Sequence, residues 1–193
     1  MRQLAKFGLI LAAICFAAAL VLALTYRVTK PAIAARAEEE EREALRLVLP
    51  DADDFVRKGR DGAEYYEGYR DKRAVGYCIR AFGNGYGGYF RGMVGIDRSG
   101  VIQGLLVLEH QETPGLGAKI GEVRPGEKDA WFLRQFKGKD GATVSMGDID
   151  AVTGATISSR AVVDAVREAV GEFMKRVRSW ELGVGSKELG GGS

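Results

Sequence analysis

A short turn near the C-terminus is the segment of this sequence best suited to chemistry. Residues 150–159 contain Thr153, Gly154, Ala155 and Thr156, a run of hydroxyl and small side chains. Because Gly154 and Ala155 have almost no side chain, a bulky group can approach the backbone there. An anion could also be held, since a helix that begins after the turn presents unpaired N–H groups and a partial positive charge.

A long amphipathic stretch follows the turn and predicts a helix from about Ser158 to Trp180. Its apolar residues recur at helical spacing, at Val162, Val166, Ala169 or Val170, Phe173 and Val177. Ser158 or Ser159 can cap such a helix. On local chemistry alone, a plain helix cap therefore competes with a functional site.

A polar loop at 109–117 is the second candidate segment, with the sequence EHQETPGLG. Glu112 and Thr113 offer polar contacts there, and Leu116 offers an apolar one. His110 is the single histidine of the chain. It either faces the site or is an ordinary loop residue, and the sequence leaves both readings open.

Alternating apolar residues in the middle of the chain predict a sheet. Val75, Tyr77, Ile79 and Ala81 fall on one face, and 65–69 is also strand-like. The glycine-rich stretch 83–92 lacks the lysine and hydroxyl of a P-loop, so a bend between strands is expected. Two more strands are predicted at 93–97 and 101–109, on either side of a turn at 97–100. A short helical stretch is predicted at 127–136. The fold class expected is α+β, with the C-terminal helix packed on the sheet.

The N-terminus predicts a membrane anchor. No charged residue occurs from Phe7 to Tyr26, and about 20 helical residues span roughly 30 Å, the thickness of the hydrocarbon core. The competing reading is a cleaved secretory signal. The length of the run favours retention, with a cytoplasmic tail at 1–6, an anchor at 7–29 and the rest of the chain exported, although basic residues on both sides leave the charge rule undecided.

The remaining residues form one domain preceded by a stalk. Pro31 suits the first turn of a second helix, and 30–50 is rich in helix formers with an acidic, solvated run at 38–41. The main domain is expected at 51–182, and a flexible glycine-rich tail at 183–193.

Composition excludes several classes of function. The 28 Lys and Arg nearly balance the 26 Asp and Glu, which gives no footprint for nucleic acid. Cys15 lies in the predicted anchor and Cys78 in a predicted strand, so neither a disulfide nor a cysteine metal cluster is expected. With one histidine and no nucleophile–base constellation, neither a metal site nor a catalytic residue is predicted.

The two candidate segments together resemble the G subunit of the Rnf (Rsx) electron transport complex, a relative of the C subunit of the sodium-pumping NADH:quinone reductase. The resemblance rests on 109–117 and 153–159, and it extends to the anchor, to 95–97, and to Trp131-Phe132 with Gln135-Phe136.

This resemblance implies an FMN joined through its phosphate to a threonine hydroxyl by a separate flavin transferase. The matching acceptor is Thr156, with Asp150 and Thr153 in the preceding motif positions and Ser158 as the second candidate. The same resemblance implies that Glu112, Thr113 and Leu116 border the flavin, beside the small residues Gly154 and Ala155.

Two functions follow from different classes. The first is an electron-transfer subunit of an ion-translocating oxidoreductase complex of the ferredoxin:NAD type, in the cytoplasmic membrane, with its FMN domain on the extracytoplasmic or periplasmic side. Its partners would be other subunits, the flavin transferase and lipid. The second is a membrane-anchored binding or scaffold module without a redox cofactor. The intact motif at 153–156 favours the first.

Overall fold

The computed structural model describes residues 2–60, 63–123, 126–127 and 130–181. The predicted tail at 183–193 lies outside the described residues. The chain divides into two compact units, Met1–Arg42 and Glu43–Ser193.

The first unit is helical and belongs to the long helix α1, Arg2–Val48. In the described part of the chain, α1 is the one helix that is long and apolar enough to cross a membrane, and its apolar window has no buried residue. The expectation of a second helix starting at Pro31 is wrong, because Pro31 lies inside a continuous helix. Strong helix formers on both sides override the one hydrogen bond that the proline nitrogen cannot donate.

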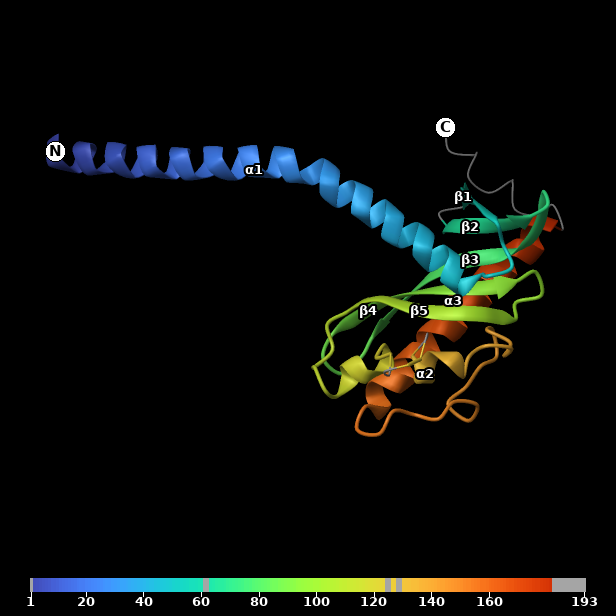
Figure 1. The fold of residues 1–193 in the computed structure, drawn as a ribbon. Coiled ribbons are helices and arrows are strands. Elements are labelled where there is room, and N and C mark those ends of the chain that lie inside the picture. The colour runs from blue at the N-terminus through green and yellow to red at the C-terminus, as the bar shows by residue number, and fades with distance from the viewer. Residues whose placement is uncertain (1, 61–62, 124–125, 128–129, 182–193) are drawn as a thin grey trace, which may run out of the picture. The chain divides into compact units, whose positions relative to one another are not determined.

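The second unit contains a five-stranded antiparallel sheet in the order β1-β2-β3-β4-β5 (Figure 1). Its strands follow the chain without a crossover: β1 Asp54–Arg60, β2 Ala63–Arg70, β3 Arg73–Asn84, β4 Tyr89–Asp97 and β5 Ile102–His110. Three helical elements follow them: the 3₁₀ helix η1 Gly117–Ile120, α2 Trp131–Arg134 and α3 Thr156–Glu181. The predicted α+β class, with a C-terminal helix on the sheet, is confirmed.

The main core lies between the sheet and α3, which runs across one face of the sheet (Figure 1). Val162, Val166 and Val170 of α3 are fully buried there. Toward the end of α3, Phe173 contacts Tyr65 and Tyr77 edge to face, with ring centroids 5.0 and 5.2 Å apart. This packing holds the start of α3, and the turn before it, in a fixed place against the sheet.

The opposite face of the sheet is covered by the last turns of α1. Ala44, Leu45 and Val48 of α1, and Leu49 directly after it, are buried with Cys78 and Met93. Burial raises the pKa of the Cys78 thiol to about 12, so this cysteine is an inert core residue, as predicted.

Three sequence predictions for the fold are corrected. Val75 packs on the α1 side, because the register between β2 and β3 shifts at Gly68 and Tyr69 and breaks the alternation. Strand β1 is absent from the prediction; it is an edge strand with few apolar residues, and pairing with β2 defines it. Helix α2 covers only Trp131–Arg134 of the predicted 127–136.

Candidate functional site

The turn before α3 is fixed by its backbone and by one serine. Gly154 has a φ of +80°, a left-handed conformation that residues with a Cβ rarely adopt. The N–H of Ala155 donates to the carbonyl of Val152 at 2.9 Å. The Oγ of Ser159 accepts from the Val152 N–H at 3.0 Å and donates to the Ala155 carbonyl at 2.9 Å. A buried hydroxyl therefore joins the turn to the first turn of α3.

Thr156 is the first residue of α3 and its side chain is exposed. Thr153 and Gly154 are exposed as well, whereas Ala155 is buried beneath them. Because Thr156 begins α3, the unpaired N–H groups and the positive end of the helix dipole lie at this position. A negative group joined to Thr156 would gain about 0.3–1 kcal/mol from the dipole.

The predicted capping role of Ser158 and Ser159 is wrong, because the helix begins at Thr156 and both serines lie inside its first turns. Ser159 instead bonds back to the turn. Ser158 is 1% exposed, and its Oγ has no hydrogen-bond partner among the described residues. The sequence could not distinguish these roles, since the difference depends on where the helix starts.

Glu112 has a buried carboxylate that is surrounded by glycine residues. Its side chain is 5% exposed, its Oε2 accepts from the Gly87 N–H at 3.0 Å, and its Oε1 has no partner in the described part of the chain. A Cβ built on Gly85 would overlap Oε1, and a Cβ built on Gly117 would overlap Oε2. Only glycine at these two positions leaves room for the carboxylate.

The structure brings the two predicted motifs together. A Cβ on Gly117 would stand 2.9 Å from the Oγ of Ser158, which links the Glu112 loop to α3. The nearest atom to a Cβ built on Gly154 is Leu116 Cδ2, at 3.8 Å. Leu116 is 49% exposed and thus forms an apolar edge beside an open turn.

Thr113 is exposed, and its carbonyl accepts from the N–H groups of Leu116 and Ala118 at 3.2 and 3.3 Å. Its backbone therefore shapes the loop into η1. Asp150, at the other end of the motif, is held by the side chain of Gln135. The Asp150 N–H donates to Gln135 Oε1 at 2.8 Å, and its carbonyl accepts from Nε2 at 3.1 Å.

His110 is the last residue of β5, is exposed, and pairs across the sheet with Phe90. Next to it, Glu109 accepts a hydrogen bond from the Tyr89 hydroxyl at 2.7 Å and forms an ion pair with Arg91 at 3.1 Å. The bond to Glu109 raises the pKa of Tyr89. These groups form an exposed polar strand end and build no acid–base pair around His110 in the part of the chain that the structure describes.

The sequence analysis did not identify two features near the candidate site. The stretch 83–92 does form the predicted bend, yet its Gly85 and Gly87 also surround Glu112. Only the pairing of β3 with β4, which brings this bend to the Glu112 loop, reveals that role. Arg160 is exposed and follows Thr156 by four residues, a spacing that puts both on one side of the helix. That spacing could have been read from the sequence.

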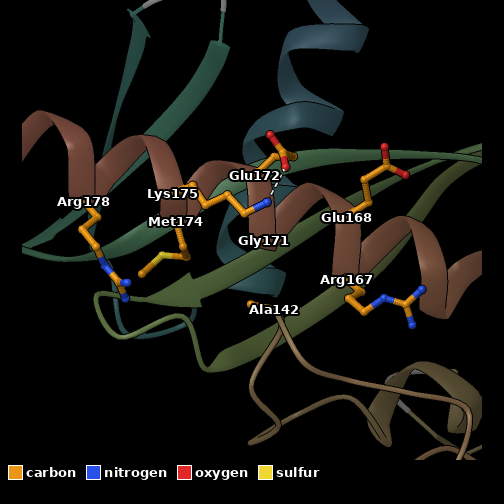
Figure 2. A pocket seen from close by; sticks show the side chains of 8 residues that line it. All are labelled: Ala142, Arg167, Glu168, Gly171, Glu172, Met174, Lys175 and Arg178. Atoms are coloured by element: carbon orange, nitrogen blue, oxygen red, sulfur yellow. Dashed lines mark hydrogen bonds and ion pairs between the residues drawn. The ribbon is translucent and has the colours of Figure 1, made fainter. Parts of the chain in front are cut away.

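A separate cavity of about 500 Å³ lies along the second half of α3. Figure 2 shows its lining, where Lys175 and Glu172 point toward each other and form an ion pair at 2.9 Å. Arg167 is likewise paired, with Asp164. None of the predicted site residues lines this cavity, and its charges are largely neutralised within the helix, so it is not the candidate site.

The residues of the turn fit an FMN attached at its phosphate. Thr156 supplies an exposed hydroxyl, Gly154 leaves open space above the backbone, and the start of α3 supplies N–H groups for phosphate oxygens. Leu116 supplies an apolar contact at the same edge. Chemically, the arrangement can hold a nucleotide cofactor and orient it.

Comparison with known proteins matches this chain to two family models, to curated relatives and to solved structures. A family model described as an FMN-binding domain matches residues 85–171, and one described as the RnfG N-terminal region matches 1–48. The G subunit of the proton-translocating ferredoxin:NAD(+) oxidoreductase complex of Clostridium ljungdahlii is 33% identical over 81% of this chain and 84% of its own length. The G subunit of the ion-translocating oxidoreductase complex of Methanosarcina acetivorans is 34% identical over 88% and 94%. The crystal structure of Shewanella oneidensis NqrC has a TM-score of 0.47 at 23% identity, over 67% of this chain and 73% of that one.

Proposed function

This chain belongs to the family of G subunits of Rnf-type ion-translocating oxidoreductase complexes, and we propose that it carries its FMN covalently, as a phosphodiester on Thr156, and relays electrons between other subunits. The observation that carries the proposal is the exposed Thr156 hydroxyl at the first residue of α3, beside the open Gly154. The FMN-binding family match spans this turn and the Glu112 loop together.

Attachment uses the hydroxyl of Thr156 as a nucleophile. Its Oγ1 forms a bond to the phosphorus of an activated flavin nucleotide, the bond from phosphorus to the leaving group breaks, and the hydroxyl proton is released. A flavin transferase would supply both the activated nucleotide and a base. The product keeps one negative charge, which the start of α3 stabilises.

The neighbouring residues have distinct roles in this proposal. Gly154 and Ala155 keep the approach to Thr156 open, and Thr153 borders it. Arg160, one helical turn after Thr156, would neutralise the phosphodiester charge. When bound, the flavin accepts and donates electrons, and the protein orients it.

The Glu112 loop forms the second wall of the site. Glu112 fixes the loop against Gly87, so that Thr113 and Leu116 are held at the edge of the turn. Leu116 would then cover apolar surface of the flavin, and Thr113 would offer a polar contact. Ser158, buried below, shapes the floor and is the second candidate for attachment.

Membrane anchoring fits the apolar first part of α1. We propose an anchor at 7–29 after a cytoplasmic tail at 1–6, a stalk at 30–50 and the FMN-binding domain at 51–182 on the outer side of the cytoplasmic membrane. Protease added to right-side-out spheroplasts should then cut after Tyr26. Cleavage only in inverted vesicles would show that the domain lies on the cytoplasmic side instead.

The test of attachment is mass spectrometry of the full chain produced with and without a flavin transferase. The expected result is a mass increase matching one FMN phosphodiester, mapped to the peptide that contains Thr156, together with a fluorescent band after denaturing electrophoresis. If the chain stays unmodified although the transferase is active and flavin is ample, the covalent attachment is refuted and the alternative function, a binding or scaffold module, is supported.

A further inference from the structure

A small pocket lies directly beside the flavin-attachment turn. Its volume is about 270 Å³, and its lining consists of Lys119, Glu122, Trp131, Val152 and Thr153. Val152 and Thr153 belong to the turn, Lys119 lies in η1, Glu122 follows η1 by two residues, and Trp131 begins α2. This volume is just below the usual range for ligand sites, about 300–1,000 Å³, so the pocket suits one planar ring system and is too small for a whole nucleotide.

The residues in and around η1, Gly117–Ile120, lie beside the turn. Leu116 directly precedes this helix, Lys119 lies in it and Glu122 follows it by two residues. Successive backbone hydrogen bonds connect the three, because Lys119 N–H donates to the Leu116 carbonyl at 3.1 Å and Glu122 N–H donates to the Lys119 carbonyl at 3.3 Å. Leu116 lies beside Gly154, and the other two line the pocket at Val152 and Thr153.

The pocket is lined by both apolar and charged side chains. Trp131 and Val152 provide apolar surface, which favours a flat aromatic ligand. Lys119 and Glu122 bring one positive and one negative charge to the same small space. Within the described part of the chain, neither residue forms an ion pair. Both charges are thus available to act on a ligand in the pocket.

We propose that this pocket holds the ring of the flavin attached to Thr156, and that Lys119 and Glu122 set its reduction potential with opposite signs. The inference rests on the proposed function. An electron added to the ring increases its negative charge, which Lys119 stabilises and Glu122 destabilises. Lys119 therefore makes the flavin easier to reduce, and Glu122 makes it harder to reduce. Both are tuning residues and take no part in bond making.

The test measures the midpoint potential of the flavinylated full chain by dye-referenced reduction with xanthine and xanthine oxidase. Lys119→Gln should lower the equilibrium constant for reduction about tenfold, and Glu122→Gln should raise it by a similar factor. For a one-electron step, tenfold corresponds to 59 mV. Flavin stoichiometry, from absorbance and mass, is measured on every variant.

Two matched variants control for net charge. Lys175→Gln and Glu172→Gln make the same charge changes in the cavity of Figure 2. Lys175 lies 19 residues beyond Thr156 on α3, about 28 Å along the helix axis at about 1.5 Å per residue. This separation exceeds the Debye length of about 8 Å at physiological salt, so neither control should move the potential.

The outcomes separate the two levels of the proposal. Opposite shifts at Lys119 and Glu122, without shifts in the controls, support the pocket. Potentials equal to those of the controls, or shifts of the same sign in both variants, overturn the proposed pocket but leave the proposed flavin attachment intact. Wild-type chain without covalent flavin overturns the proposed function itself.

A second variant leaves the charges of the pocket unchanged. Trp131→Leu removes an aromatic wall of the pocket, so iodide should reach the flavin more easily and quench its fluorescence more strongly than in the wild type. An unchanged quenching constant, with full flavin attachment, would show that the ring lies elsewhere.

Discussion

Two turns of this protein contain similar residues and use them differently. The turn at 97–100 combines Asp97 and Ser99 with Gly100 at a φ of +96°, and the turn at 153–156 combines hydroxyl residues with Gly154 at +80°. In the first turn, Asp97 Oδ1 accepts from the Ser99 N–H at 2.8 Å, the Ser99 hydroxyl at 2.6 Å and the Val101 N–H at 3.0 Å. These three hydrogen bonds stay within residues 97–101, and the other carboxylate oxygen, Oδ2, accepts from Gln103 Nε2 at 3.5 Å.

The second turn is held from outside. Besides the turn's own bond from Ala155 N–H to the Val152 carbonyl, Ser159 of α3 makes two hydrogen bonds to its backbone, and the described part of the chain shows no hydrogen bond from the Thr156 side chain. The two glycines differ as well, since a Cβ on Gly100 would contact Met174 at 3.4 Å and one on Gly154 would meet only Leu116 at 3.8 Å. A turn stabilised by a neighbour leaves its own hydroxyl available for chemistry.

The largest expected effect is at Thr156. Thr156→Val keeps the branched shape and removes the hydroxyl, so the covalent flavin should be lost completely, as read by in-gel fluorescence. Thr156→Ser should retain some flavin, because it keeps the nucleophile. Thr153→Val is the matched control and should remain flavinylated. Peptide mapping that found FMN on Thr153 or Ser158 would contradict the assignment to Thr156.

A valine at Gly154 tests whether openness matters. Gly154→Val should reduce flavin attachment at least about tenfold, since its side chain occupies the approach to Thr156, and the left-handed backbone should cost about 1–2 kcal/mol of stability. Gly138 has a φ of +81° and open space around it, so Gly138→Val is a control with equal strain. Circular dichroism and flavin fluorescence are measured together. Equal flavin in both variants would refute the steric argument.

A substitution in the turn at 97–100 should change the stability of the domain and not its flavin attachment. Asp97→Asn weakens the acceptor of three hydrogen bonds, and about 1–3 kcal/mol of unfolding free energy should be lost at pH 7 while flavin attachment is unchanged. Although burial acts to raise the pKa of Asp97, bonds from Ser99 and Val101 lower it overall.

The lowered pKa gives this effect a pH dependence. The stabilisation by Asp97 is complete above the unfolded pKa, about 4, and is lost as pH falls through the lower folded value. Denaturant unfolding from pH 7 to pH 2 should show the difference between the wild type and the variant shrinking in that acid range. A constant difference would mean that the Asp97 charge is not involved.

The smallest effect is expected at Ser158. Its hydroxyl is buried without a partner among the described residues, so Ser158→Ala should change stability by less than about 0.5 kcal/mol and leave the flavin attached. Ser159→Ala, its neighbour, should cost about 1–3 kcal/mol because two hydrogen bonds are lost. Similar losses in both variants would show that Ser158 has a partner in solution.

Regular residue patterns predicted their elements correctly. The alternation at 77–81, the turn at 97–100 and the helical spacing of 162–177 all correspond to observed elements. Two of the failures share a cause. Strand β1 and the side of the sheet on which Val75 packs both depend on pairing with β2, so neither can be read from local spacing. The third concerns α3, which begins at Thr156 and thus two residues before the first predicted capping serine.

Residue types at short spacing were enough to identify the family, the apolar helix and the two motifs. That the motifs meet follows from the folded chain alone, which puts Leu116 beside Gly154 and encloses Glu112 between Gly85 and Gly117. Folding also leaves Thr156 exposed while it buries Ser158. Hydroxyl residues two positions apart have similar local chemistry, and packing of α3 on the sheet determines which of them faces solvent.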